Sequence, residues 1–369
     1  MKKLNILLVF LSFLMLSCSG KVDESEVKKA QQFFESVFQD RVLDSPEFQA
    51  SLGYKSNYDQ WDDITWQKSR AMAIRAKDDL VFMEKNLNYD KLDESTKVSY
   101  RLMEKQLRRT VERDGFIFHN YPITHRGGKH SSIPSFLINY HKVDEERDVQ
   151  DYIGRLRNIE PLIDDLIEQL RLRQDVEKLA PAFVYPQAIK TAENVISGYP
   201  FEETKKQNVI FEDFMKKLNN LDISDAQKLR YQSEAEAVLV TLVNASYRKL
   251  IAFLKEQSSL ADNNHGVWKF EDGADYYQFV LDGYTTLGLT AEEIHEIGLS
   301  EVDRIHSEIY EIMEKVNFEG TLKEFFDFMR EDPQFYYPQG PEGRKMYIDQ
   351  VQVVVDTLEA RIDELFYGL

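Results

Sequence analysis

Apolar residues recur at helical spacing along most of this chain, and the alternating patterns typical of strands are almost absent. Spacings of i, i+3, i+4 and i+7 place apolar side chains on one face of a helix. The clearest stripes are Ile163, Leu166, Ile167 and Leu170; Leu239, Leu242, Val243, Leu250, Phe253 and Leu254; and Val351, Val355, Leu358, Ile362 and Leu365. The sequence therefore predicts a mainly α fold, a body built from many helices.

Turn-forming residues lie between these stripes, but no low-complexity linker or internal repeat divides the chain. Pro161 lacks an N–H and should kink or restart a helix. We therefore expect one continuous helical domain over residues 27–369, with room for two lobes.

The N-terminus has the pattern of an export signal. Lys2 and Lys3 precede an apolar run from Leu4 to Leu16, which is too short for a membrane-spanning helix. The segment ending at Cys18 resembles a lipobox, so we expect a signal peptide over residues 1–17, lipid attachment at Cys18 and a polar tether over residues 18–26. The alternative is an ordinary signal whose cleavage discards Cys18. Either reading places the protein in the bacterial cell envelope, at the periplasmic face or the outer membrane.

The charge balance excludes two classes of partner. The chain has 46 Lys and Arg residues against 64 Asp and Glu residues, a net charge of −18, which becomes −20 once Lys2 and Lys3 leave with the signal. A strongly acidic protein is repelled by nucleic acid and by anionic membrane surfaces. We therefore expect no nucleic-acid partner, and membrane contact through the Cys18 lipid only.

One dipeptide resembles the start of a zinc-peptidase motif. In HExxH sequences, two histidines one helical turn apart bind zinc and the glutamate acts as general base. Here His295-Glu296 is followed by Leu299 at the second ligand position, and His306 is eleven residues away, roughly 16 Å along a helix. Both histidines are expected to face the interior or a cleft wall, and Thr290 with Glu293 predicts a capping box that starts this helix.

The segment from His119 to His141 holds four of the seven histidines, with two glycines and two prolines. Its histidine spacing fits no helical metal site, and Pro122 and Pro134 argue against a helix. Two readings stay open: a ligand-binding loop that supplies donors to a carboxylate or carbonyl, or a surface Ω-loop. With the aromatic run Phe335 to Pro338 as a second source of cleft residues, the candidate substrate-cleft residues are His119, Arg126, His130, Ser131, Tyr336 and Tyr337.

Several blocks of the sequence, taken in order, resemble one bacterial family. They are SPEFQASLGYKSNYDQWDD, FHNYPITHRGGKHSSIPSFLINYHKV, GVWKFEDGADYY, TTLGLTAEEIHEIGLSEVDRIHSEI and DPQFYYP. From about Ser45 to the end, the chain resembles the N-terminal part of the family called domain of unknown function 885. The resemblance implies exported or lipid-anchored helical proteins similar to zinc metallopeptidases, with a deep cleft between helical lobes.

The family's zinc motif, an HEGxPGHH-like helix, lies in its C-terminal part and has no match in this sequence. No catalytic residue and no metal ligand can therefore be assigned to any position here, and zinc is expected only if a C-terminal half exists. We expect the helical domain to be incomplete at its C-terminus and to expose an apolar face that the missing half would cover, although a naturally short variant is the other explanation.

Two hypotheses follow. The first is the N-terminal portion of an exported, zinc-metallopeptidase-like lipoprotein that contributes a cleft wall for a peptide-like substrate. The alternative is a non-catalytic helical envelope lipoprotein that binds a ligand or a protein partner. An HExxH-type sequence further along the gene would decide for the first.

Overall fold

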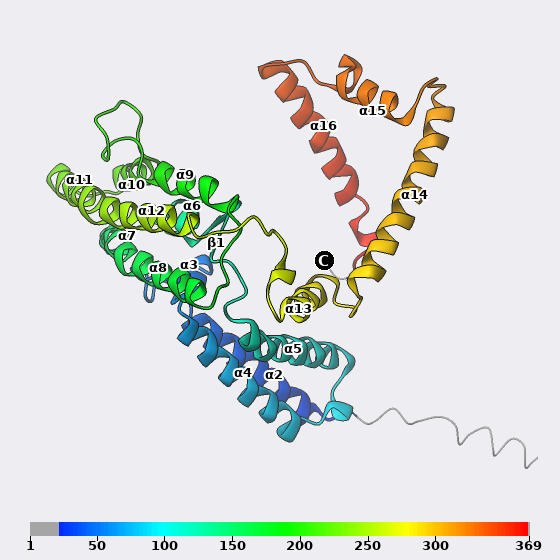
Figure 1. Cartoon of the computed structure of the whole chain (residues 1–369), viewed down its shortest axis with the longest axis horizontal. Coiled ribbons are helices and arrows are strands. Elements are labelled where there is room, and N and C mark those ends of the chain that lie inside the picture. The colour runs from blue at the N-terminus through cyan, green and yellow to red at the C-terminus, as the bar shows by residue number, and fades with distance from the viewer. Residues whose placement is uncertain (1–21, 368–369) are drawn as a thin grey trace, which may run out of the picture. The chain divides into compact units, whose positions relative to one another are not determined.

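The computed structural model describes residues 22–367 and divides the chain into two compact units, Met1–Tyr276 and Tyr277–Leu369. Figure 1 shows that both units are built from helices. The prediction of a mainly α fold is confirmed. The predicted signal peptide and Cys18 lie outside the described residues, so the structure does not bear on them.

The helices of unit 1 are α2 (Glu24–Leu43), α3 (Pro46–Ser51), α4 (Trp66–Asn86), α5 (Glu94–Arg113), α6 (Lys129–Tyr140), α7 (Glu146–Arg157), α8 (Ile159–Asp175), α9 (Val184–Val195), α10 (Val209–Asn219), α11 (Asp225–Val238) and α12 (Asn244–Ser258). A π-helical turn, Leu239–Val243, joins α11 to α12. Helix α13 (Gly273–Thr285) spans the division, and α14 (Ala291–Lys315), α15 (Leu322–Glu331) and α16 (Pro341–Glu359) follow in unit 2. A small hairpin of β1 (Ile123–Thr124) and β2 (Gly127–Gly128) pairs Ile123 with Gly128 in antiparallel register.

The main core of unit 1 lies among α6 to α12, where the predicted stripes are buried. Ile163, Leu166 and Leu170 of α8 are at most 6% exposed, and Leu250 and Leu254 of α12 are fully buried. These stripes meet because α12 packs against both α8 and α9. The helical period in the sequence therefore identified the core-facing residues correctly.

A smaller core joins α2, α4 and α5. Ala30, Leu80, Met83 and Leu107 are buried at its centre. Helix α5 packs against both α2 and α4, so these three helices form a bundle of their own within unit 1 (Figure 1).

The junction between α7 and α8 confirms the prediction for Pro161. Helix α7 ends at Arg157 and α8 begins at Ile159, so Pro161 lies in the first turn of α8. A proline is tolerated there because first-turn N–H groups have no partner within the helix.

Helix α6 contradicts the expectation that Pro122 and Pro134 keep the His119 to His141 segment free of helix, because Pro134 lies inside it. A proline in a helix leaves the carbonyl four residues earlier without its usual donor. Here that carbonyl belongs to His130, and it accepts a hydrogen bond from the buried Tyr247 hydroxyl at 2.5 Å. Tyr247 of α12 thus replaces the hydrogen bond that Pro134 cannot make.

Among the described residues, one helical stretch, Asp225–Ser258, is long and apolar enough to cross a membrane by length and composition. Its side chains Tyr231, Leu239, Val243 and Leu250 lie in the main core of unit 1 instead.

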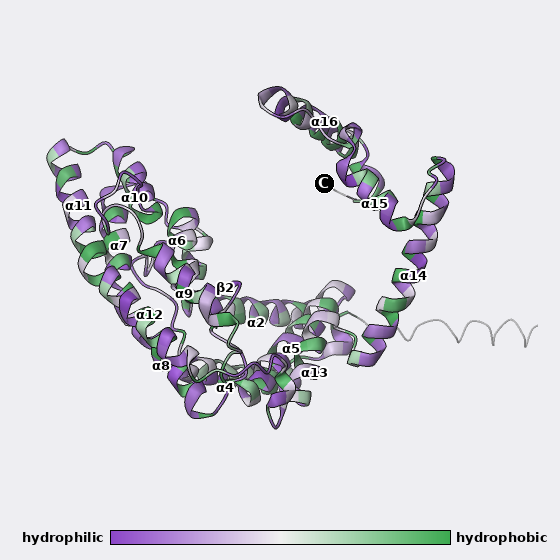
Figure 2. Ribbon diagram, turned by 45° about the horizontal axis from the view of Figure 1, so that its top comes forward, coloured by the Kyte–Doolittle hydropathy of each residue, from purple (hydrophilic) through white to green (hydrophobic). Residues whose placement is uncertain are grey.

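Unit 2 has almost no core of its own. In its described part, Met313 and Phe325 are the only buried hydrophobic residues. Figure 2 shows hydrophobic residues along α14 and α16, and the last predicted stripe, from Val351 to Leu365, is exposed. The helical period was predicted correctly here, but this unit provides nothing to cover its apolar residues.

Helix α14 begins as predicted. The Thr290 hydroxyl accepts from the Glu293 N–H, and the Glu293 carboxylate accepts from the Thr290 N–H. Of the two placements predicted for His295 and His306, the interior or a cleft wall, the interior is wrong for His295, which is exposed, whereas His306 is half-buried. Most apolar residues of α14 are also exposed, so unit 2 does not bury a face of this helix.

Candidate functional site

Three segments far apart in the sequence bring together His119, Lys178 and Asp272. His119 follows α5, Lys178 follows α8 and Asp272 directly precedes α13. His119 Nε2 lies 2.7 Å from Asp272 Oδ1 and 2.6 Å from Lys178 Nζ, and the Lys178 ammonium also donates to Asp272 Oδ1 at 3.0 Å. We refer to these three residues as the His119 cluster.

The hydrogen bonds of the His119 cluster converge on Asp272. A single ring nitrogen can donate to Asp272 or accept from Lys178, but it cannot do both at once. Hydrogen bonding from His119, followed by that from Lys178, lowers the pKa of Asp272 to about 2. Asp272 is therefore an anion at neutral pH.

The His119 cluster has a buried side and an open side. The His119 side chain is 4% exposed and its ring is surrounded by Phe116, Phe270 and Tyr276, whereas the Asp272 side chain is 43% exposed. A ligand could therefore contact the Asp272 carboxylate directly. Next to Lys178 lies a cavity of about 20 Å³, lined also by Tyr121, Arg173, Tyr185 and Gln257, which is room for about one water molecule.

The structure places the next three sequence candidates in and after the β1–β2 hairpin. Arg126 is exposed in the turn. The Ser131 hydroxyl donates to the Gly128 carbonyl and accepts from its N–H, which closes the start of α6. A Cβ on Gly128 would lie 2.4 Å from the Pro122 carbonyl oxygen, so the chain turns here only with glycine.

His130 lies in the interior. It is fully buried, and burial lowers its pKa to about 4. The imidazole is therefore neutral at physiological pH and packs in the interior of unit 1.

Tyr336 and Tyr337 belong to unit 2, whereas the other four candidates belong to unit 1. Both tyrosines are exposed. The Tyr336 hydroxyl donates to the Arg330 carbonyl, and the Tyr337 ring packs edge-on against Tyr347 at 5.8 Å between centroids.

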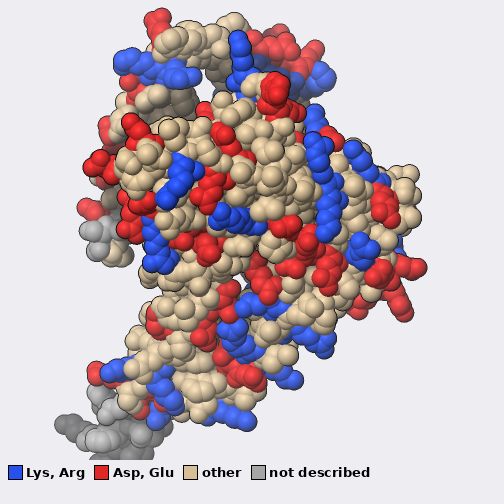
Figure 3. Space-filling model, turned by 90° about the vertical axis from the view of Figure 1, so that its left-hand side faces the viewer, with Lys and Arg blue, Asp and Glu red and all other residues tan. Residues whose placement is uncertain are grey.

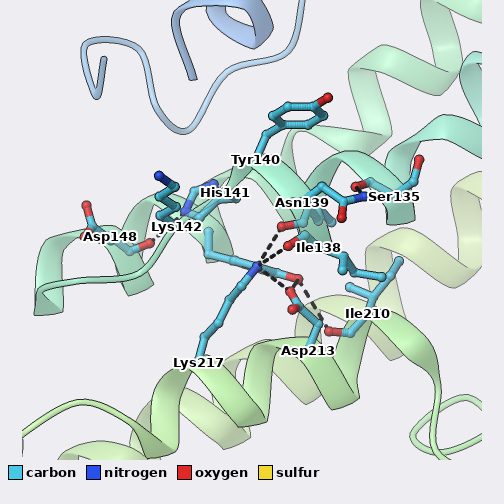
Figure 4. A network of polar contacts seen from close by, with 12 residues as sticks. Ser135, Ile138, Asn139, Tyr140, His141, Lys142, Asp148, Ile210, Asp213 and Lys217 are labelled. Atoms are coloured by element: carbon cyan, nitrogen blue, oxygen red, sulfur yellow. Dashed lines mark hydrogen bonds and ion pairs between the residues drawn. The ribbon is translucent and has the colours of Figure 1, made fainter. Parts of the chain in front are cut away.

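Sequence reasoning missed a half-buried ion pair at the end of α6. Figure 4 shows Lys217 reaching from α10 toward α6. Its ammonium donates to the Leu137 carbonyl at 2.7 Å, the Ile138 carbonyl at 3.2 Å and the Asp213 carboxylate at 2.7 Å. Lys217 thus caps carbonyls that the last turn of a helix leaves without partners. The i, i+4 spacing of Asp213 and Lys217 was the available signal.

A second network surrounds Arg155, which is fully buried. Its guanidinium donates to His141 Nδ1 at 3.0 Å, so Nε2 carries the proton and donates to the Asp148 carbonyl at 3.0 Å. Burial lowers the pKa of His141 to about 3. The rings of Tyr58 and Trp61 pack against the Arg155 cation, so this network stabilises the core.

The described residues do not fit the zinc ion of metallopeptidases. Residues 22–367 contain no group of three or more His, Cys, Asp or Glu side chains placed to hold a metal. Since structural and catalytic zinc need three or four such ligands, zinc chemistry is not assigned to any of these residues.

Comparison with known proteins gives a family and a fold. The family described as "Bacterial protein of unknown function (DUF885)" matches residues 46–369, and no curated protein matches the chain. The chain is similar in structure to a crystal structure described as "the putative lipoprotein from Colwellia psychrerythraea", with a TM-score of 0.80 and 21% identity over 93% of this chain. This chain spans 60% of the length of that one. By the extent of the family match, the chain belongs to the DUF885 family of bacterial proteins.

Proposed function

We propose that this chain is the scaffold portion of an exported lipoprotein resembling zinc metallopeptidases, and that it supplies one wall of a cleft for a peptide-like substrate. In this proposal, unit 2 packs against a further polypeptide segment, and that segment carries the metal ligands and the catalytic residues. The chain alone is inert as a hydrolase.

The observation that carries the proposal is the bare apolar surface of unit 2. Hydrophobic side chains stay about half exposed along whole helices, including Val302 (47%) and Tyr310 (54%) on α14 and Ile348 (56%) and Val354 (50%) on α16. Soluble proteins rarely expose apolar area on this scale unless another surface covers it. This chain spans 60% of the Colwellia lipoprotein, and the remainder of that protein is long enough for a covering segment.

The His119 cluster is the part of unit 1 best suited to face a peptide. Asp272 presents an anionic, partly exposed carboxylate that is held in place by Lys178 and His119. Such a group can accept from a backbone N–H or bind an α-amino group. Of the sequence candidates, His119 keeps a role here as the residue that positions Asp272.

The test begins with the gene beyond the codon for Leu369. The proposal expects an in-frame continuation with an HExxH-type motif, and a longer product that binds zinc and hydrolyses peptides while residues 19–369 alone do neither. Within that product, Asp272→Asn should raise KM more than it lowers kcat, because Asp272 is proposed to bind substrate and not to react. A stop codon directly after Leu369 would refute the proposal.

A further inference from the structure

The bundle of α2, α4 and α5 carries a groove on its surface, within unit 1. It is lined by Val37, Phe38, Asp40, Arg41 and Asp44 of α2, by Met72, Arg75, Ala76 and Asp79 of α4, and by Met103, Gln106, Leu107 and Thr110 of α5. Its cavity volume is about 140 Å³, close to the roughly 150 Å³ that holds a benzene molecule in an engineered apolar cavity. We call it the α2–α4–α5 groove.

The floor of the groove is apolar and adaptable. Ala76 and Leu107 are buried at its base, while Phe38 and Met72 remain 40% exposed at its edge. Methionine and phenylalanine side chains accommodate hydrocarbon of varied shape. The floor therefore suits an alkyl chain.

Two carboxylates beside the groove have no cation in direct contact, although the Arg75 charge acts on Asp79 from further away. Arg75 and Lys68 both bind Asp44, at 2.5 and 2.8 Å, and the Arg41 guanidinium lies over the Phe48 ring at 5.3 Å. The cations near the groove are thus already engaged.

Asp40 and Asp79, in contrast, form no ion pair or side-chain hydrogen bond with another described residue. Burial, and then the neighbouring Asp40 charge, raise the pKa of Asp79. Figure 3 shows Lys and Arg interspersed with Asp and Glu over one face of the molecule.

We propose that the α2–α4–α5 groove binds an alkylammonium ligand, with the hydrocarbon on the apolar floor and the ammonium between Asp40 and Asp79. This chemistry is shared by free alkylamines and by lysine side chains. The ligand's charge would offset the repulsion between the two carboxylates, which an alcohol or a carboxylate of equal length cannot do. The inference is independent of the proposed function, because the groove includes neither unit 2 nor any residue of the His119 cluster.

The experiment titrates residues 19–369, which omit the predicted signal peptide and Cys18, with n-hexylamine, n-hexanol and n-hexanoate. The methyl NMR signals of Met72 and Met103 are the readout. We expect roughly millimolar binding of hexylamine, in line with a ligand of about seven heavy atoms, at least fivefold weaker binding of hexanol, and no shift with hexanoate.

A second arm uses acetyl-Gly-Lys-Gly amide. Binding of this peptide would support a lysine side chain as ligand, and binding of hexylamine alone would support a free amine. Equal affinity for hexylamine and hexanol, or no binding of either amine, would overturn the proposal.

Substitutions test whether the charge of Asp79 contributes to amine binding and control for effects on folding. Asp79→Asn should weaken hexylamine binding at least fivefold and leave hexanol unchanged, whereas the matched control Asp175→Asn, at an exposed aspartate outside the groove, should change neither. Met72→Lys, at the exposed edge, should abolish amine binding because its own ammonium occupies the site. Unchanged hexylamine affinity in Asp79→Asn would contradict the inference.

Discussion

Replacing Tyr247 by phenylalanine tests why α6 tolerates Pro134. The Tyr247 hydroxyl, fully buried, is the donor to the His130 carbonyl that Pro134 leaves without a backbone donor. Without this hydroxyl, the buried His130 carbonyl has no hydrogen-bond donor, which lowers the free energy of unfolding by about 1–3 kcal/mol. The short 2.5 Å contact and complete burial favour the middle of that range, so we expect Tyr247→Phe to lower the free energy of unfolding of unit 1 by about 2 kcal/mol.

The assay is urea unfolding followed by tryptophan fluorescence, which reports on unit 1 alone because all three tryptophans lie before residue 277. Pro134→Ala supplies a double-mutant cycle. An alanine at position 134 can donate to the His130 carbonyl, so Tyr247→Phe should cost about 1 kcal/mol less in that background. Tyr185→Phe, which removes a buried hydroxyl with a longer 3.3 Å bond to Gln257, is the control. An equal cost of Tyr247→Phe in the native and Pro134→Ala backgrounds would refute this explanation.

Three further predictions concern ionisable groups. Burial lowers the pKa of His130 to about 4, against roughly 6.5 in the unfolded chain, so the unfolded state binds the proton first. Unit 1 should therefore lose stability as the pH falls below about 6.5, with His130 contributing about 1.4 kcal/mol per pH unit. His130→Leu, measured by urea unfolding at pH 7 and pH 5, should reduce this dependence of stability on pH, and an unchanged dependence would contradict the assignment. Lys217→Met should destabilise unit 1 by about 2 kcal/mol, since it removes the charged hydrogen-bond donor of the half-buried Asp213 carboxylate. The double variant Lys217→Met with Asp213→Leu should recover part of that loss in the same assay. The pKa of Asp272 is lowered to about 2, so its stabilising effect is present above about pH 4 and is lost as the pH falls toward 2; a carboxylate titration by NMR that places Asp272 at an ordinary value would show that the His119 cluster does not form.

The sequence predicted local structure well because local structure depends on neighbours along the chain. The stripe from Ile163 to Leu170 identified a buried helix face, and Thr290 with Glu293 identified a helix start. The residues of each signal lie within a few positions of one another, so no tertiary information is needed to interpret either signal.

The errors and omissions arise from partners distant in sequence. Pro134 was interpreted as a helix breaker because the compensating donor is Tyr247, which is 117 residues from His130, the residue whose carbonyl it binds. The His119 cluster could not be assembled from sequence, since Asp272 is 153 residues from His119. An apolar stripe also does not specify what covers it, which is why the exposed helices of unit 2 and the buried helices of unit 1 have similar patterns.

Amide hydrogen exchange over residues 291–359 is the most direct test of the claim that unit 2 needs a further segment. Helices that bury little apolar surface open easily. We expect fast exchange of α14 to α16 in residues 19–369, next to slow exchange of α8 and α12. In the longer product of the gene, we expect slow exchange of all five helices. Slow exchange of α14 to α16 in residues 19–369 alone, independent of protein concentration, would contradict that claim.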